Sequence, residues 1–277
     1  MLLAIRASWR LLRVALHLAY GLFLAGTFYP MLGLAQRRRI KQRWSRDLLV
    51  LFGVQLDNTG NVAGGARLLV SNHISWLDIF VINAVEPAVF VSKDDILAWP
   101  LIGTLSRHTE TIYLERGCHR SAHSVSQRIV AVLSSGTTVA IFPEGTTSHG
   151  ECVLPFRGAL LEGALRAGTP VQPLALRYTT RRGGKTKAAA YCGATSLLES
   201  MWTIAAAPSL RAHLIHLEPL PVDGMDRRML AMTSQMLIRR TLFPDGAAGI
   251  SSTAENVTQT RTPLAPDNRS ESALGVI

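Results

Sequence analysis

From residue 66 onward, short apolar runs alternate with helix-like stretches, and this alternation constrains the fold more than any other feature of the chain. The stronger strand candidates are residues 67–70, 88–91, 111–114, 138–142 and 171–176, and the weaker ones are 187–192 and 213–218. Helix-like stretches lie between them, for example 121–136 and 158–168, each of which closes on a glycine. Nearly continuous apolar strands are typical of parallel sheets that are buried on both faces. The sequence therefore predicts an α/β fold with a mostly parallel sheet flanked by helices.

The composition limits the class of protein. Apolar residues make up 48% of the 277 residues, which excludes general disorder. The formal net charge is +10, carried almost wholly by Arg, and it favours an anionic partner such as nucleic acid or anionic lipid. The three cysteines are far apart and show no C-x-x-C spacing, so we interpret them as ordinary thiols in a reducing compartment.

The N-terminal segment is predicted to associate with a membrane. Residues 14–35 hold no acidic or permanently cationic side chain, and as a helix they would extend about 33 Å, enough to cross a bilayer core. Basic residues crowd positions 37–46, where a signal peptide would have its cleavage site, so we expect the segment to be retained. Pro30 and nearby glycines would let it bend and re-emerge on the same side. We expect a monotopic anchor on the cytoplasmic face of the inner membrane, with a single span as the alternative.

These features divide the chain into parts. Residues 1–55 are predicted to form a membrane-anchoring helical region and residues 56–245 the functional domain. Residues 246–277 are rich in Ser, Thr, Ala and Pro without periodicity, and we expect them to be disordered.

His73 and Asp78 stand where a site is expected, because ligands of parallel sheets bind beyond the carboxyl ends of the strands. Residues five apart lie about 140° apart on a helix, so the two can meet only if His73 is in a loop and Asp78 begins the next helix. An Asp that accepts from one imidazole nitrogen fixes the tautomer, and such a dyad can deprotonate a hydroxyl. The alternative is a loop histidine followed by an Asp that the helix dipole favours. His213 and Glu218 have the same spacing, and we interpret that pair as structural.

Other polar residues follow two further strand candidates. The segment "FPEGTTS" places Glu144, Gly145 and Thr146 at the end of one strand, an arrangement suited to polar substrate groups. Arg116 and Arg120 follow another strand, and an arginine there can hold a phosphate through two hydrogen bonds. The alternative for Arg116 is a solvated charge at a strand end.

Taken in order, these segments resemble the glycerolipid acyltransferase family, whose bacterial members acylate 1-acyl-glycerol-3-phosphate. The resemblance covers roughly residues 65–220. The family's N-H-x-S-x-x-D block is similar to "NHISWLD", which contains His73 and Asp78. "KDDILAWPLIG", "IYLERG", "FPEGTTS", "PFRGAL" and "GTPVQPLAL" are similar to the blocks that follow.

The resemblance implies the roles of residues. It implies that His73 and Asp78 form the general-base dyad and that the substrate-binding positions are Lys93, Arg116, Arg120, Glu144, Gly145, Thr146 and Pro173. It implies direct transfer of a fatty acyl group from an acyl-CoA or acyl carrier protein thioester to the hydroxyl of a membrane lysolipid. No bound cofactor or metal motif accompanies it: the sequence holds no P-loop, no H-E-x-x-H and no dinucleotide fingerprint.

Two departures from the family pattern bear on the acceptor. Thr147 stands where phosphatidic-acid-forming members usually carry Arg, and Glu115 stands where they usually carry Asp. We expect 1-acyl-sn-glycerol-3-phosphate as acceptor, with lyso-ornithine lipid or another lysophospholipid as the alternative. A hydrolase that uses His73 to activate water is a rival interpretation. A nucleic-acid-binding protein is another, but no aromatic platform or binding motif accompanies the basic cluster, so no nucleic-acid partner is expected.

Overall fold

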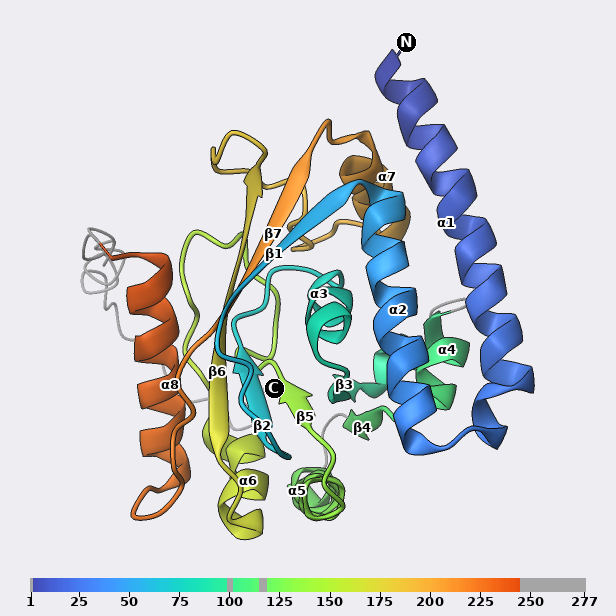
Figure 1. The fold of residues 1–277 in the computed structure, drawn as a ribbon. Helices are drawn as coiled ribbons and strands as arrows, with labels where there is room; N and C mark the ends of the chain where they lie inside the picture. Colours follow the sequence, from blue (N-terminus) through green and yellow to red (C-terminus); the bar gives the residue numbers. More distant parts are fainter. Residues whose placement is uncertain (1, 99–101, 115–118, 245–277) are drawn as a thin grey trace, which may run out of the picture.

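The computed structural model describes residues 2–98, 102–114 and 119–244, which contain a seven-stranded sheet of order β1-β7-β6-β2-β5-β3-β4 (Figure 1). The strands are β1 Val54–Gly60, β2 Leu68–Ser71, β3 Val89–Lys93, β4 Ile112–Leu114, β5 Val139–Ile141, β6 Val171–Thr180 and β7 Leu210–His216. Neighbouring strands of this sheet run parallel except β6 and β7, which are antiparallel. The predicted α/β fold with a mostly parallel sheet is confirmed.

Helices cover both faces of the sheet. They are α1 Leu2–Thr27, α2 Leu34–Phe52, α3 Asp78–Val85, α4 Ile102–His108, α5 His119–Ser134, α6 Glu162–Ala167, α7 Leu197–Ala206 and α8 Arg227–Leu242. Figure 1 shows α8 on one side of the sheet and α1, α2, α3 and α7 on the other. Successive side chains of β2 pack on opposite faces of the sheet. Leu68 and Val70 pack in the core with α5, α6 and α8, whereas Leu69 packs with α1, α2 and α3. Burial on both sides explains why the strands read as continuous apolar runs.

One strand prediction is wrong, and one strand was missed. Residues 187–192 form turns and loop, because their backbone is engaged elsewhere: the Tyr191 N–H donates to the Ile74 carbonyl at 3.0 Å. Strand β1 was not predicted, since it lies at the sheet edge and most of its residues are partly or fully exposed, which leaves little apolar pattern. The segment 246–277, predicted to be disordered, lies outside the described residues.

The N-terminal segment is a helical hairpin. Helix α1 ends at Thr27, a 3-10 turn at Tyr29–Met31 contains Pro30, and α2 starts at Leu34, so residues 14–35 do not form one helix. The bend predicted at Pro30 is present. Over the described residues, none of the helices has both the length and the apolar character needed for crossing a bilayer. Buried side chains of both helices, Ala7, Val14, Leu48 and Phe52 among them, belong to the same core as the sheet.

Two arginines of α1 fasten it to the end of α7. Arg6 Nη2 donates to the Ala206 carbonyl at 2.5 Å, and Arg10 Nη1 donates to the carbonyls of Ala205 and Ala207 at 3.0 and 2.8 Å. These carbonyls end a helix, where a cation is favoured by the helix dipole. Gly53, which closes α2 with φ of 75°, lies directly under the same guanidinium: a Cβ there would approach Arg10 Nη2 to 2.1 Å. Arg10 therefore joins three helices.

Replacing Arg10 by Ala is expected to destabilise the protein by about 1–3 kcal/mol, because it leaves two terminal carbonyls of α7 without donors. The matched control is Arg13→Ala, which removes an exposed arginine from the same helix. Thermal unfolding in detergent measures the difference. Equal melting temperatures for the two variants would contradict this role of Arg10.

Candidate active site

His73 lies in the loop that follows β2, and Asp78 is the first residue of α3, as the sequence predicted. His73 Nδ1 lies 2.9 Å from Asp78 Oδ2. Since a carboxylate oxygen accepts, Nδ1 carries the proton and the lone pair is on Nε2. The imidazole stacks on Phe142 with ring centroids 3.9 Å apart, and the His73 side chain keeps 18% of its surface exposed. The geometry leaves Nε2 as the nitrogen that can accept a proton from a substrate.

Asp78 is fully buried, and its carboxylate accepts four hydrogen bonds. Besides His73, its Oδ2 accepts from the backbone N–H groups of Ile74 and Ser75 at 2.7 and 2.9 Å. Its Oδ1 accepts from the hydroxyl of Tyr178, on β6, at 2.7 Å. A buried charge is tolerated when it is paired and hydrogen-bonded in this way. Burial and the neighbouring Asp78 raise the pKa of Tyr178 well above its ordinary value, so the phenol stays a donor.

The His73 loop is attached to the sheet on both sides. The Asn72 side chain pairs with the backbone of Leu176 on β6, donating to its carbonyl and accepting from its N–H, each at 2.9 Å. The carbonyl of His73 accepts from the backbone N–H of Ser148 at 2.8 Å. These contacts continue the strand ladder past the end of β2 and hold the histidine in place.

Glu144 lies under the same loop. Its Oε1 accepts from the backbone N–H of His73 at 3.2 Å, and the residue is 3% exposed. Burial raises the pKa of Glu144 to about 8. Gly145 follows with φ of 70°, a conformation that favours glycine, and turns the chain back above Phe142. The structure therefore brings Glu144 to the dyad as a loop support.

The other predicted site residues are placed as follows. Thr146 is exposed beyond Gly145, whereas the Thr147 hydroxyl donates to the Tyr191 carbonyl. Lys93 ends β3 beside Leu114, the last residue of β4. Pro173 is buried in β6 opposite Val70, where its carbonyl accepts from the Leu217 N–H at 3.0 Å. Arg116 lies outside the described residues, and for Arg120 only its place near the start of α5 is described.

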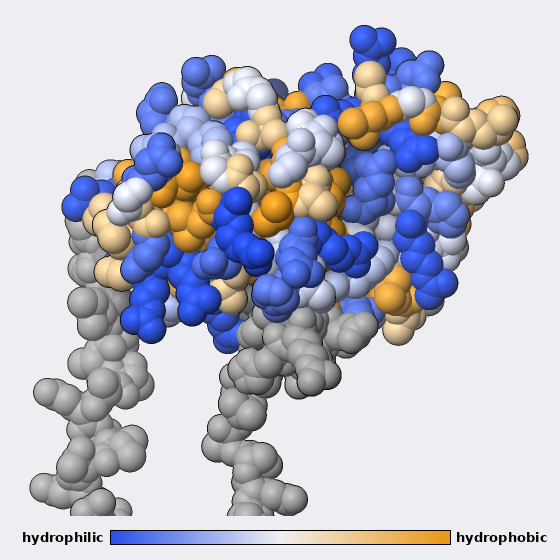
Figure 2. Space-filling view, turned by 90° about the horizontal axis from the view of Figure 1, so that it is seen from below, coloured by the Kyte–Doolittle hydropathy of each residue, from blue (hydrophilic) through white to orange (hydrophobic). Residues whose placement is uncertain are grey.

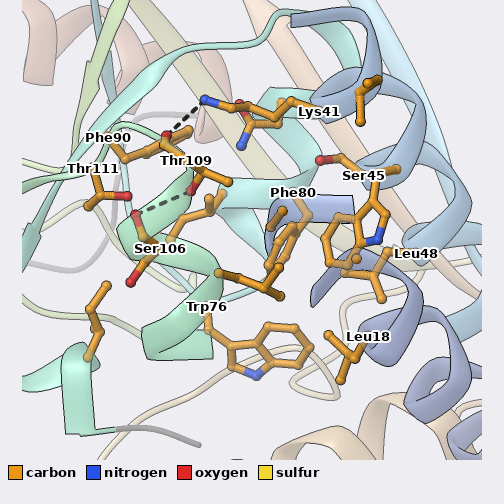
Figure 3. A pocket seen from close by; sticks show the side chains of 18 of the residues that line it. Leu18, Lys41, Ser45, Leu48, Trp76, Phe80, Phe90, Ser106, Thr109 and Thr111 are labelled. Carbon is orange, nitrogen blue, oxygen red and sulfur yellow. Dashed lines mark hydrogen bonds between the residues drawn. The ribbon is translucent and has the colours of Figure 1, made fainter. Parts of the chain in front are cut away.

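An apolar cavity opens between the helical hairpin and the sheet, close to the dyad. Phe142, which stacks on His73, also stacks on Phe90, and Phe90 lines this cavity together with Trp76 and Phe80. Figure 3 shows apolar side chains such as Leu18 and Leu48 towards one end and polar side chains such as Ser106 and Thr109 towards the other. Lys41 stands at the polar end, donating to the carbonyls of Ala88 and Thr109, and burial lowers its pKa to about 8.

Sequence reasoning did not find every residue of the site. Tyr178 and Phe142 both contact the dyad, but they read as ordinary apolar positions of strands. Only the position of Phe142 immediately before "PEGTTS" carried a signal, since that residue had to lie near the strand end. Nothing in the sequence joins Tyr178 to Asp78, one hundred residues earlier.

Glu144 is expected to make the stability of the protein fall with rising pH. Because its folded-state pKa is about 8, above its ordinary value near 4.5, the folded state binds the proton more tightly across this range. The associated stability is full below pH 4.5 and is lost as the pH rises to 8, by roughly 3 kcal/mol between pH 5.5 and 8. Glu144→Gln should remove this part of the slope, and Glu218→Gln, a carboxylate farther along the chain, should keep it. Melting temperatures measured from pH 5 to 9 test this; parallel curves for wild type and Glu144→Gln would refute it.

Comparison with known proteins places this site in a family. A family profile described as Acyltransferase matches residues 53–177. The chain is 36% identical to a lyso-ornithine lipid O-acyltransferase of Pseudomonas aeruginosa over 212 residues, which cover 76% of this chain and 81% of that protein. It is also 36% identical to a 1-acyl-sn-glycerol-3-phosphate acyltransferase of Neisseria gonorrhoeae, over 50% of this chain and 53% of that protein.

A solved structure shares the fold. The crystal structure of the 1-acyl-sn-glycerophosphate acyltransferase from Thermotoga maritima superimposes with a TM-score of 0.60 at 20% sequence identity, covering 86% of this chain and 98% of that one. Together with the extended match to the Pseudomonas protein, these comparisons confirm the family resemblance of the motifs. The chain belongs to the acyltransferase family and is an acyltransferase.

Proposed function

We propose that this acyltransferase transfers a fatty acyl group from a thioester to the free hydroxyl of a lysolipid, with His73 as general base. The observation that carries the proposal is the hydrogen bond between His73 Nδ1 and Asp78, which leaves Nε2 as the basic nitrogen. The His73 ring connects to the apolar cavity through the stacked rings of Phe142 and Phe90. A base in this setting serves to activate a hydroxyl whose reaction partner is largely hydrocarbon.

The reaction proceeds by direct attack. His73 Nε2 takes the proton from the acceptor hydroxyl as its oxygen bonds to the thioester carbonyl carbon. The tetrahedral intermediate collapses, the carbon–sulfur bond breaks, and the imidazolium returns its proton to the leaving thiolate. Asp78 stabilises the imidazolium that forms in between, because its buried carboxylate is the hydrogen-bond partner of Nδ1.

The apolar cavity is the proposed site of the fatty acyl chain. It runs from Phe90, next to the aromatic stack on His73, to the interface of α1 and α2. Its polar end offers little to a ligand, since the Ser106 hydroxyl donates to the Gly103 carbonyl and Lys41 is bound to two carbonyls. A long alkyl chain in such a cavity gains from the hydrophobic effect.

For the acceptor, 1-acyl-sn-glycerol-3-phosphate remains the first candidate, with Arg116 and Arg120 as proposed partners of its phosphate. Lyso-ornithine lipid is the second candidate, and two observations favour it. Thr147 stands where phosphatidic-acid-forming members of the family usually carry an arginine after Gly-Thr, and its hydroxyl donates to the Tyr191 carbonyl. The relative matched over 81% of its own length is named a lyso-ornithine lipid O-acyltransferase.

The proposed membrane surface is the outer side of α1. Six large apolar side chains there are more than half exposed and recur every three or four residues, so they share one face: Ile5, Trp9, Leu12, Leu16, Tyr20 and Phe23. Leu198 and Trp202 of α7, which packs against α1, are exposed too. By contrast, the underside of the molecule shows apolar patches interrupted by hydrophilic side chains (Figure 2).

Purified enzyme in mixed micelles with an oleoyl thioester tests the reaction. His73→Ala should lower kcat by about 10²–10⁴-fold, the usual contribution of a general base. Asp78→Asn should cost less, and Tyr178→Phe, which removes one of four hydrogen bonds to Asp78, should cost about tenfold or less. All three should fold, as checked by circular dichroism.

The acceptor panel holds lysophosphatidic acid, lyso-ornithine lipid and lysophosphatidylcholine, and the diacyl product is quantified. Product from lysophosphatidic acid identifies the first candidate, and product from lyso-ornithine lipid alone identifies the second. Free fatty acid as the only His73-dependent product would replace acyl transfer by hydrolysis.

Flotation with anionic liposomes tests the membrane surface. Replacing Trp9, Leu16 and Phe23 together by Ser should lower liposome binding at least tenfold, because each large apolar side chain contributes roughly 1.5–3 kcal/mol when buried. The matched control replaces the exposed Met229, Met232 and Met236 of α8 by Ser and should bind as the wild type does. Equal loss in both variants would exclude α1 as the specific surface.

A further inference from the structure

A second pocket, of about 590 Å³, lies beside the carboxyl end of β6 and has a different character from the apolar cavity. Its walls come from Ile74, residues 149–151, residues 177–179 of β6, the loop 183–187 that follows β6, and residues 242–244 at the C-terminal end of α8. No residue lines both this pocket and the apolar cavity. We call it the basic pocket.

Basic side chains outnumber acidic ones in its lining. Arg177, Lys185 and Lys187 line it, as does His149, so two of the chain's four lysines are gathered here. Glu151 is the acidic member, and its Oε1 lies 2.9 Å from Lys187 Nζ, with both side chains about 60% exposed. Lys187 first, and then His149 and Lys185, lower the pKa of Glu151, which places these basic side chains around one carboxylate. The pocket is left with an excess of positive charge.

The pocket adjoins the dyad. Ile74 and Tyr178 line it, and the same two residues donate hydrogen bonds to Asp78, from a backbone N–H and from a hydroxyl. The loop 149–151 is pressed against Ile74: a Cβ on Gly150 would lie 3.0 Å from Ile74 Cδ1. The apolar cavity approaches the dyad from elsewhere, through Phe142 and Phe90. The dyad therefore has an apolar cavity and a basic pocket as separate neighbours.

We propose that the basic pocket binds the phosphate esters of the acyl donor, through Arg177, Lys185 and Lys187. The inference rests on the proposed function, in which the thioester carbonyl reaches His73 and the acyl chain enters the apolar cavity. The rest of the thioester is a flexible pantetheine arm that ends in a diphosphate in coenzyme A and in a phosphodiester in a carrier protein, and it must leave the dyad by another route. Lysine and arginine bind phosphate oxygens by charge-assisted hydrogen bonds.

Glu151 has a defined part in this scheme. Its exposed ion pair with Lys187 is weak, as ion pairs on the surface generally are. Without a donor, Glu151 holds Lys187 in position. A bound phosphate, which carries more acceptor oxygens than a carboxylate, displaces Glu151 from the lysine, so Glu151 competes with the donor for Lys187. Removing Glu151 should consequently tighten donor binding.

Steady-state kinetics with oleoyl-CoA tests the pocket. Lys185→Ala combined with Lys187→Ala should raise the KM for oleoyl-CoA about tenfold with kcat retained, the effect of losing hydrogen bonds to a charged group. The matched control, Arg181→Ala with Arg182→Ala, removes the same charge from exposed residues of the same loop that do not line the pocket, and should leave the KM unchanged. Glu151→Gln should lower the KM.

A phosphate-free donor separates the sources of phosphate. With oleoyl-pantetheine, wild type and the Lys185/Lys187 variant should have equal kinetics. A raised KM for the lysolipid with an unchanged KM for oleoyl-CoA would assign the pocket to the acceptor and overturn the proposal. An equal effect of the Arg181/Arg182 control would also overturn it, since overall charge would then explain the result.

Direct binding distinguishes failure of this inference from failure of the proposed function. Titration calorimetry with coenzyme A and with pantetheine needs no turnover. The wild type should bind coenzyme A more tightly than pantetheine, and this preference should fall about tenfold in the Lys185/Lys187 variant, which keeps Arg177. That result stands even if no lysolipid is acylated, whereas acylation without any such difference in affinity would reject the basic pocket alone.

Discussion

The buried carboxylate of Asp78 is the interaction on which the rest of the site depends. A charge without solvent contact is tolerated only when donors surround it, and here they come from three places: the His73 imidazole, the backbone of the loop after β2, and Tyr178 on β6. Satisfying this one group fixes the loop against the start of α3 and ties both to the neighbouring strand. The orientation of the histidine follows from it, since Nδ1 is held by Asp78 Oδ2.

The two-sided sheet determines what surrounds the dyad. Alternate residues of β2 and β5 pack against different helices, so the strand ends open towards both layers. On one side the α1–α2 hairpin leaves an apolar cavity beside Trp76 and Phe90. At the end of β6, loops carrying Lys185 and Lys187 form a basic pocket. In the proposed reaction, the apolar cavity suits the hydrocarbon end of an acyl thioester, and the basic pocket suits its anionic end.

The basic character of the chain is used in more than one way. Much of the N-terminal charge serves the fold: Arg6 and Arg10 bind the end of α7, and Lys41 binds two carbonyls at the cavity. Cations held in this way are less available to lipid headgroups. Exposed arginines of α2, such as Arg39 and Arg43, are better placed for an anionic surface. Net charge alone therefore overstates the charge that can reach a partner.

Sequence by itself determined the α/β architecture and brought His73 and Asp78 into view, because both follow from local signals: apolar runs of strand length, glycines that close helices, and polar residues where a buried strand ends. It also indicated the bend at Pro30, where proline limits the backbone. Tertiary structure alone decided the rest. Tyr178 meets Asp78, Phe142 joins His73 to the apolar cavity, and Lys187 pairs with Glu151 at the basic pocket, all between segments remote in sequence. The physical reason is that a strand or a turn is specified by neighbours along the chain, whereas the partner of a side chain across the sheet is specified by packing that no local pattern records.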